Sequence, residues 1–472
     1  MRRRDCLLLG AQAGALAGCG RAARLLEPDP PPLLDAPASR SLGRLLLDRA
    51  AFGPRPGDVP RVDADPGAWL EAQLHPERLD DAACALRLAG LDAWHLPTEL
   101  TAELRPVHLE RQLAAHAVLR ATYSRRQLQE VLATTWADHF HVSTGKDGCP
   151  GLLPAHLRDA IRPHVLGRFA DLLRAATLSP AMLVYLDGRA NTADAPNENH
   201  ARELLELHAL GVDGGYTQRD VMELARALTG WTVRAPRERR GPGAVGALRF
   251  DPARHDGGPK TLLGRRLPAG GGRRDLDRAL GILVAHPSCA RHVARRLVRA
   301  LAGAPAPPAL LEAATRAFRA SGGDLRRTTR AVLAHPGLVD TRGAVLARPF
   351  RFVVSALRAT GAATRADGDV LLHLEAMGQR PHRHPTPDGY PLEARPWLGS
   401  LSARWRFAHA LAHGRLDDTD PVALGPLPAL PDADARHLLG RAPTAAERAA
   451  FAPLAPADRL AAILSSPAYQ TS

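Results

Sequence analysis

The sequence predicts a mainly α fold, a large multi-helix domain with a small β-hairpin insertion near residues 230–267. From Leu42 onward, apolar residues mostly recur at the three- and four-residue spacing of amphipathic helices. Between Gly230 and Leu267 glycines become frequent, and the apolar runs are short enough for the strands of a hairpin. Aromatic residues make up only 4% of the chain, so the core must be built mainly from Leu, Ala and Val.

The expected elements follow from this spacing in chain order. Helices are predicted at Ser41–Ala51, Gly67–Leu74, Thr98–Thr122, Ser124–Phe140, Leu153–Ala176, Glu198–Gly211, Thr217–Thr229, Leu276–Ala285, Ala290–Leu301, Pro308–Ala320, Leu325–Ala334, Pro349–Thr360 and Leu401–His413. Short strands are predicted at Trp231–Arg234, Ala247–Asp251 and Thr261–Leu267. A Ser-Pro or His-Pro step recurs at Ser179, His286, His335 and Ser466. Proline is tolerated at the first position of a helix, and the side chain that precedes it can cap the N-terminus of that helix. Each Ser-Pro or His-Pro step therefore predicts the start of a helix.

The composition excludes several classes of protein. The chain has 472 residues and a net charge of +13, but only two of its 62 basic residues are lysines, Lys146 and Lys260. The arginines are spread along the chain and no nucleic-acid-binding motif is found, so no nucleic-acid partner is expected. No run of 18 apolar residues predicts a membrane span. The spacing of Cys84, Cys149 and Cys289 matches no zinc motif, so cysteine chemistry is not expected.

The N-terminus predicts export. Residues 1–18 have a basic start at Arg2–Arg4 and a short apolar stretch, the layout of a signal peptide with a twin-arginine-like motif. Leu16–Cys19 resembles a bacterial lipobox, which predicts lipidation of Cys19; a plain secretory signal is the alternative. Residues 19–40 are proline-rich and read as a tether, and residues 41–472 form one helical domain with its motif core at 136–264. We therefore expect a protein of the periplasm or cell envelope, anchored to a membrane by lipid.

Polar motifs are densest between residues 136 and 264, and further short motifs flank them. They are Trp136–Val142, Leu178–Asp187, Pro196–Val221, Leu228–Trp231, Phe250–Gly264, Arg49–Gly53, Gly323–Leu325, Arg348–Phe350, Pro387–Tyr390 and Ser466–Gln470. Together these runs resemble the bacterial family known as domain of unknown function 1800, from about Ala38 to the C-terminus. His200 and Ala209 depart from the residues usual in the family. The resemblance implies an exported protein, often encoded beside an exported alkaline-phosphatase-like family, but it implies no activity.

The helix expected at 198–210 carries the first candidate site residues. At 100° per residue, Asn199, Glu203 and Glu206 lie within about 60° of one another. Two interpretations remain open: a solvated face that pairs with Arg202 or Arg226, or carboxylates turned into a cleft for acid–base work. His200 and His208 fall among leucines and are predicted to be packed in the core, and Asn197 is an ordinary N-cap.

The second group lies in or near the glycine-rich insertion. His139 and His255 are the candidate metal ligands, and an adjacent Asp256 could orient His255. Lys260 stands out in an arginine-rich chain because a compact ammonium is not replaceable by a guanidinium. The candidate catalytic residues are Glu203, Glu206, Asp256 and Lys260, and the candidate substrate-binding residues are Asn191, Asn197, Asn199, Arg202 and Trp231.

Two functions stay open at this point. The first is a cell-envelope hydrolase with a His/carboxylate site, for which a divalent metal is the cofactor these ligands would take. In that case His139, Asn199, Glu203, Glu206, His255, Asp256 and Lys260 should converge on one cleft. The second is a non-catalytic helical scaffold that binds the exported alkaline-phosphatase-like partner implied by the resemblance. A scaffold should have its polar motif side chains paired internally.

The N-terminal motifs generate a direct test. If Cys19 carries the lipid anchor, Cys19→Ala should move the protein from the membrane fraction to the soluble fraction or leave it unprocessed. Fractionation followed by mass spectrometry of the N-terminal peptide measures both results. An unchanged membrane fraction and an unchanged mass would show that Cys19 is not lipidated.

Overall fold

The computed structural model describes residues 40–234, 244–420 and 431–471. The fold is mainly α, as predicted, and helices surround one large apolar core. Four strands of three residues each form two antiparallel two-stranded sheets. No helix in these ranges has the length and apolarity needed to cross a membrane.

The first half of the described chain contains α2 (Leu42–Ala50), α3 (Asp58–Ala64), α4 (Pro66–Leu74), α5 (Ala82–Leu88), α6 (Asp92–His95), α7 (Thr98–Thr101), α8 (Pro106–Tyr123), α9 (Gln127–His139), α10 (Leu153–Ala155), α11 (Phe169–Thr177), α12 (Pro180–Tyr185), α13 (Glu198–Glu203) and α14 (Gln218–Ala227). The strands follow: β1 (Trp231–Val233), β2 (Leu248–Phe250), β3 (Lys260–Leu262) and β4 (Arg265–Leu267). The second half contains α15 (Arg274–Ala285), α16 (Pro287–Ala302), α17 (Pro308–Ala320), α18 (Leu325–Leu333), α19 (Pro349–Thr360), α20 (Asp369–Ala376), α21 (Leu401–Ala412), α22 (Pro431–Leu439), α23 (Ala445–Phe451), α24 (Pro456–Ser465) and α25 (Pro467–Gln470).

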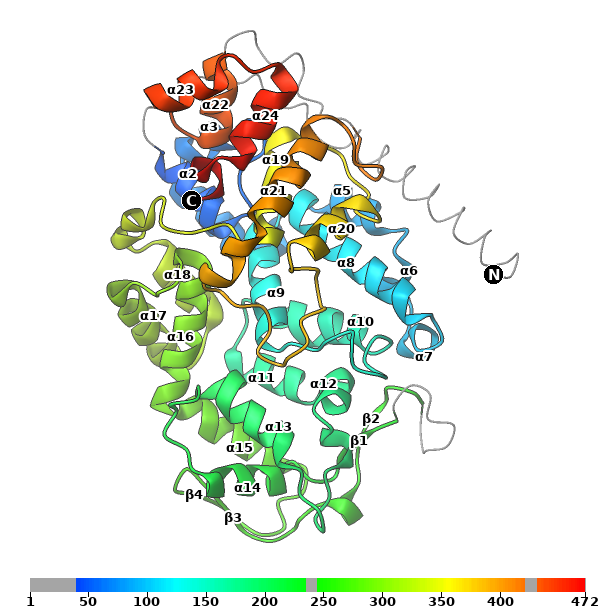
Figure 1. Cartoon of the computed structure of the whole chain (residues 1–472). Helices are drawn as coiled ribbons and strands as arrows, with labels where there is room; N and C mark the ends of the chain where they lie inside the picture. The colour runs from blue at the N-terminus through cyan, green and yellow to red at the C-terminus, as the bar shows by residue number, and fades with distance from the viewer. Residues whose placement is uncertain (1–39, 235–243, 421–430, 472) are drawn as a thin grey trace, which may run out of the picture.

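These elements form an elongated body with α9 in its middle (Figure 1). Helices α16, α17 and α18 pack against one another on one side. The C-terminal helices α22–α24 lie at one end beside α2, and α14 lies with the β-strands at the opposite end (Figure 1). The motif-rich segment from α11 to α14 therefore lies between the centre and the strand end.

Two predicted helices were wrong in their continuity. Thr98–Thr122 is broken into α7 and α8, because Pro106 begins a new helix and Arg105 is extended. Leu153–Ala176 is broken into α10, a π-helical turn, a 3₁₀ turn that contains Pro163, and α11. The predicted helix Glu198–Gly211, by contrast, is confirmed as one helix, in which α13 continues without a break into a second π-helical turn, Leu204–Ala209.

The insertion contains two hairpins where the sequence predicted one. Strand β1 pairs with β2, with Trp231 opposite Phe250. The predicted strand Thr261–Leu267 instead folds back on itself as β3 and β4. Leu263 and Gly264, between these strands, both have positive φ, which is the geometry of a two-residue hairpin turn.

The predicted Pro corners are confirmed. The Ser179 hydroxyl accepts a hydrogen bond from the backbone N–H of Met182, and Ser466 caps α25 in the same way. The ring nitrogens of His286 and His335 accept from the backbone N–H two residues further on, so these histidines are caps, as expected. Each corner is encoded by neighbouring residues, which is why the sequence alone located it.

Buried histidines gather around the two π-helical turns. His156 begins the first turn, where its ring nitrogens contact the Ser179 hydroxyl at 2.7 Å and the Phe140 carbonyl at 3.0 Å. His200 and His208 are each only 1% exposed, which confirms their predicted place in the core. Burial lowers the pKa of His156 and of His200 to about 4, and that of His208 to about 3. These imidazoles are neutral in the folded protein at neutral pH.

This histidine core predicts that the fold loses stability in mild acid. In the unfolded chain each imidazole takes up a proton near pH 6.5, whereas the folded protein resists protonation down to about pH 4 for His156 and His200. The unfolded state therefore binds more protons, and the free energy of unfolding should fall by up to about 1.4 kcal/mol per pH unit for each histidine below pH 6.5. Denaturant titrations between pH 7 and 4 measure this slope.

His200→Leu provides the control for this prediction. Both ring nitrogens of His200 are buried without a hydrogen-bond partner among the described residues, so the substitution removes a titrating group and no hydrogen bond. In His200→Leu the free energy of unfolding should therefore fall less steeply with decreasing pH, by up to about 1.4 kcal/mol per pH unit, the contribution of one histidine. An unchanged slope would contradict the assignment.

Candidate functional site

A pocket of about 410 Å³ lies where α16, the end of α13 and the C-terminal end of α9 meet. We call it the arginine pocket, and its lining residues are His139, Glu206, Leu207, Leu210, Gly211, Val212, Asp213, Ser288, Arg291, His292, Arg295, Arg296, Arg299 and Asp388. A second pocket, which includes Trp94 and His116, has only about 70 Å³. That volume suits a few water molecules, whereas the arginine pocket falls in the range of small-molecule sites.

Two histidines of the pocket cap the end of the helix that contains α13. The last carbonyl groups of a helix have no partner within it. Here the Leu207 carbonyl accepts a hydrogen bond from Nε2 of His292 at 2.8 Å, and the His208 carbonyl accepts one from Nε2 of His139 at 3.0 Å. A carbonyl only accepts, so Nε2 carries the proton in both rings and Nδ1 keeps a lone pair.

The charge of these two imidazoles is set by their surroundings. Burial lowers the pKa of His139 well below its usual value, and the positive charge of Arg296 lowers it further. Burial also lowers the pKa of His292, against the raising effect of its carbonyl partner. Both rings are therefore neutral, and their centroids lie 5.7 Å apart. Gly211, with φ of +86°, lies against Nδ1 of His292, where a Cβ would approach to 2.9 Å.

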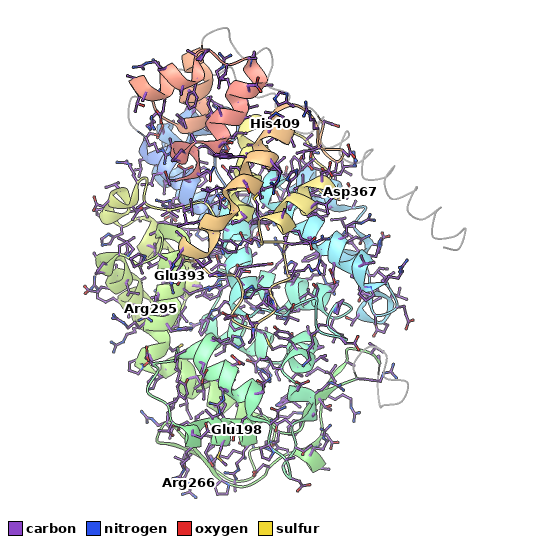
Figure 2. The ribbon with its side chains drawn as sticks, viewed as in Figure 1. Glu198, Arg266, Arg295, Asp367, Glu393 and His409 are labelled. Carbon is purple, nitrogen blue, oxygen red and sulfur yellow. The ribbon has the colours of Figure 1, made fainter. Side chains whose placement is uncertain are left out.

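Arginines of α16 supply the positive charge of the pocket. Arg291, Arg295 and Arg299 are spaced four residues apart, so they lie along one face of the helix, and Arg296 lies beside them. Figure 2 labels Arg295 on the side of the molecule formed by α16. Arg299 forms an ion pair with Glu393.

The other three arginines of α16 are not held in ion pairs within the described ranges of the chain. In the described part of the chain, Arg291, Arg295 and Arg296 form no ion pair with a carboxylate, although each lines the pocket. Arg296 donates to the Thr135 carbonyl at 3.3 Å, and its buried Nε has no hydrogen-bond partner among the described residues. Burial lowers the pKa of Arg296 to about 10, so its guanidinium is still charged at neutral pH. These groups make the α16 wall of the pocket positively charged, while the carboxylates of Glu206, Asp213 and Asp388 line the same pocket.

Carboxylates also line the pocket. Glu206 and Asp388 line it, and Glu206 is 3.6 Å from Nη1 of Arg202. Glu203 is half-buried next to them, and its pKa is raised by burial and by the negative charges of Glu206 and Asp388. Three carboxylates at one place favour retention of a proton on one of them.

Asp388 reaches the pocket because of the glycine that follows it. Gly389 has φ of +69°, and a Cβ there would lie 2.0 Å from the carbonyl oxygen of Asp138. Only glycine permits this approach, which holds the Pro387–Tyr390 loop against the end of α9. His141 supports the same loop by a 2.9 Å hydrogen bond to the His384 carbonyl.

The predicted asparagines have structural roles at this site. Asn191 is 1% exposed, donates to the Ala225 carbonyl at 2.8 Å and accepts from the backbone N–H of Asn197 at 2.8 Å. Asn197 is the N-cap of α13, as predicted, and also donates to the Asp187 carbonyl. Asn199 donates to the Leu186 carbonyl at 3.2 Å. Their amide groups hold the loop before α13 in place.

The second predicted group is a separate buried network. Nζ of Lys260 donates to the Asp256 carbonyl at 2.5 Å, the Gly258 carbonyl at 2.9 Å and Oδ2 of Asp275 at 2.9 Å. These three acceptors use all three ammonium protons, which explains why lysine stands here in an arginine-rich chain. Nε2 of His255 is 3.3 Å from the same Asp275 oxygen, and its Nδ1 is 2.9 Å from the Thr229 carbonyl.

Three further candidate site residues, Asp256, Trp231 and Arg202, also contact other side chains of the protein. Asp256 forms an ion pair with Arg226 at 2.6 Å, and this hydrogen bond lowers the pKa of Asp256. Trp231 is 7% exposed and packs on Phe250, with ring centroids 5.2 Å apart. Arg202 spans Glu198 and Gln218 on the outer face of α13 and α14.

The structure therefore divides the seven residues expected in one cleft. His139 and Glu206 line the arginine pocket with Glu203 beside them, whereas His255, Asp256 and Lys260 lie beyond α14, which packs between α13 and β3. His139 and His255 do not belong to a shared metal-binding group: among the described residues one cluster of three ligands is found, and it lies at α21 and α24. Cys84, Cys149 and Cys289 are buried and free.

Sequence reasoning missed His292, Asp388 and the arginines of α16. The four-residue spacing of Arg291, Arg295 and Arg299 along one predicted helix was the signal that could have found the positive wall. Asp388 lies in a motif that the sequence analysis noted without assigning a role to it. Nothing local connects these residues with His139.

The comparisons with known proteins identify a family and nothing beyond it. A family model described as "Protein of unknown function (DUF1800)" matches residues 45–471, nearly the whole chain. No curated protein and no solved structure shows significant similarity to the chain.

The Lys260 network generates a stability prediction. Lys260→Met removes the cation from a pair whose side chains are 1% and 0% exposed, and leaves the buried Asp275 with only the longer contacts to His255 at 3.3 Å and to Arg278 at 3.7 Å. The free energy of unfolding should fall by about 3–5 kcal/mol. Lys146→Met is the matched control, because its ion pair with Asp187 is exposed and should contribute less than about 1 kcal/mol. Equal losses in denaturant titrations of the two variants would refute the structural role of Lys260.

Proposed function

Since the chain belongs to the DUF1800 family, whose description gives no function, we propose a function that is argued from the side chains of the chain itself. In this proposal the protein is a hydrolase-type enzyme that binds an anionic substrate in the arginine pocket. One observation carries this proposal. Three arginines that form no ion pair with a carboxylate among the described residues, Arg291, Arg295 and Arg296, line the same pocket as two neutral histidines. Guanidinium groups that are not held in ion pairs suit a ligand with phosphate or carboxylate groups.

The two histidines are suited to act as the general base. Nδ1 of His139 keeps a lone pair because Nε2 is committed to the His208 carbonyl. In the proposed reaction Nδ1 takes a proton from a water molecule, and the resulting hydroxide attacks the electrophilic centre of the bound anion. His292 donates its Nε2 proton to the Leu207 carbonyl in the same way, so its Nδ1 also keeps a lone pair, and its ring centroid lies 5.7 Å from that of His139.

The carboxylate cluster of Glu203, Glu206 and Asp388 is suited to act as the proton donor. The raised pKa of Glu203, which results from burial and from the charges of Glu206 and Asp388, favours a proton on this cluster. The bond to the leaving group breaks as that proton is transferred to the leaving oxygen, and the proton taken up by His139 returns to the cluster through solvent. Asp256 and Lys260 have no part in this reaction, because their polar atoms are engaged in the separate network.

A non-catalytic scaffold is the second candidate function. The observation that favours it is the internal pairing of Asn191, Asn197, Asn199 and Lys260, four of the predicted site residues. In this alternative the arginine pocket binds an acidic segment of an exported alkaline-phosphatase-like partner. Both candidate functions are compatible with the proposed export and lipid anchoring of the protein. The signal and lipidation motifs, in residues 1–19, lie outside the described residues.

Arg295→Gln tests the proposed function. Arg295 is exposed on α16, so the substitution should leave the fold intact and remove one guanidinium from the pocket. Binding of inorganic phosphate or citrate, measured by calorimetry, should weaken about tenfold, the loss of about 1.4 kcal/mol expected for one charged hydrogen bond. Arg316→Gln, in an exposed ion pair on α17, is the matched control and should bind like the unmodified protein.

Glu203→Gln separates the enzyme from the scaffold. A panel of chromogenic esters with and without anionic groups should show hydrolysis of the anionic members alone. Glu203→Gln should retain anion binding and lose turnover. The protonated cluster is the active form, so turnover should fall as pH rises through its pKa. Anion binding with no turnover on any ester would favour the scaffold, and equal binding by Arg295→Gln and the unmodified protein would refute the pocket.

A further inference from the structure

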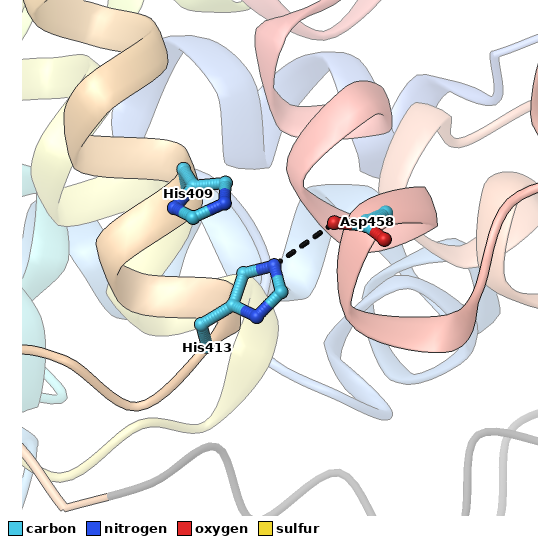
Figure 3. Close-up of side chains that lie close together, drawn as sticks. All are labelled: His409, His413 and Asp458. Carbon is cyan, nitrogen blue, oxygen red and sulfur yellow. Dashed lines mark hydrogen bonds and ion pairs between the residues drawn. The ribbon is translucent and has the colours of Figure 1, made fainter.

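A histidine pair on α21 lies against a carboxylate on α24, far from the arginine pocket in the chain (Figure 3). His409 lies on α21 and His413 follows its end, one turn further along. Their rings are stacked, with centroids 4.2 Å apart and an interplanar angle of 26°. Nε2 of His413 is 3.0 Å from Oδ1 of Asp458, in the first turn of α24.

The three side chains offer a compact set of ligand atoms. One nitrogen from each histidine and one oxygen of Asp458 all lie within 4.8 Å of one another. The packing of α21 on α24 fixes the helices that present them, with Phe407 and Leu464 both fully buried. The side chains of His413 and Asp458 are 24% and 51% exposed, so the cluster is open to solvent at the surface.

The partners of Asp458 are unusual for this chain. Most ion-paired carboxylates here are bound by arginine, for example Asp256 by Arg226. Asp458 forms an ion pair with His413 alone among the described residues, and with no guanidinium. Its second oxygen and the ring of His409 therefore face no competing fixed cation in the described part of the chain.

We propose that His409, His413 and Asp458 form a binding site for a divalent transition-metal ion, with Zn²⁺ the best match. Two imidazoles and one carboxylate are ligands that Zn²⁺ accepts in tetrahedral sites, with water in the fourth position. Ca²⁺ requires six to eight oxygen ligands and is not matched by this set. The site is independent of the arginine pocket and of the hydrolase proposal.

The metal would connect α21 to α24 across 45 residues of sequence. A metal ion that binds the folded chain and not the unfolded one shifts the equilibrium toward the folded state. The ion would therefore hold the C-terminal helices on the body of the protein. Since the cluster is open to solvent, the ion would exchange with solution without unfolding.

The test uses the full chain without a histidine tag, stripped of metal and titrated with Zn²⁺ in a calorimeter. The expected result is one saturable site and a higher Tm with Zn²⁺, with no such response to Ca²⁺ or Mg²⁺. His409→Ala, His413→Ala and Asp458→Asn should each weaken Zn²⁺ binding at least tenfold and abolish the Tm shift. Co²⁺ should give the visible absorption of a tetrahedral site, and His409→Ala should remove it.

His75→Ala is the matched control. His75 and Glu77 form another surface His–carboxylate pair with the same 3.0 Å distance, but with a single histidine. This variant should keep both Zn²⁺ affinity and the Tm shift, and circular dichroism should show that all variants fold. The absence of Zn²⁺ binding at 100 µM, equal affinity in the α21 and α24 variants, or an equal loss in His75→Ala would each overturn the proposal.

Discussion

The capping of one helix by two histidine side chains holds the centre of this molecule together. The helix that begins at Glu198 ends in a π-helical turn, and its Leu207 and His208 carbonyls accept hydrogen bonds from His292 and His139. These bonds connect α9, the π-helical turn and α16, which are far apart in sequence. They also fix which nitrogen of each ring carries the proton. The same interactions that close the core therefore prepare the chemistry of the arginine pocket.

How much could be predicted from the sequence depends on the range of each interaction. The caps at Ser179, His286, His335 and Ser466 involve residues two or three positions apart, and the sequence located all of them. The mainly α class followed from the helical spacing in the same way. The breaks at Pro106 and Pro163 were visible as prolines, but the strong apolar periodicity around them favoured continuous helices. Tertiary packing supplied the contacts that the broken backbone lost.

Only part of the candidate site could be predicted from the sequence, because residues that are far apart in the chain come together there only in the folded protein. His139, Glu203 and Glu206 were found from motif density, whereas His292 and Asp388 come from an arginine-rich helix and a short loop with no local connection to them. The π-helical turn adds a further difficulty, because one extra residue in a helical turn rotates all that follows. Lys260 was singled out from the sequence as a candidate catalytic residue, and in the structure its ammonium donates to three acceptors.

The contrast between the two lysines has a practical consequence for chemical labelling. The amine of Lys260 is enclosed by its three acceptors, while Lys146 is at the surface with its side chain 38% exposed. An amine-reactive dye applied to the folded protein should therefore attach at Lys146 and at the chain's α-amino group, because the many arginines do not react. Lys146 is 2.9 Å from Asp187, in the loop before α13. A fluorophore there would report on the loop that precedes α13, at a position given by the natural sequence.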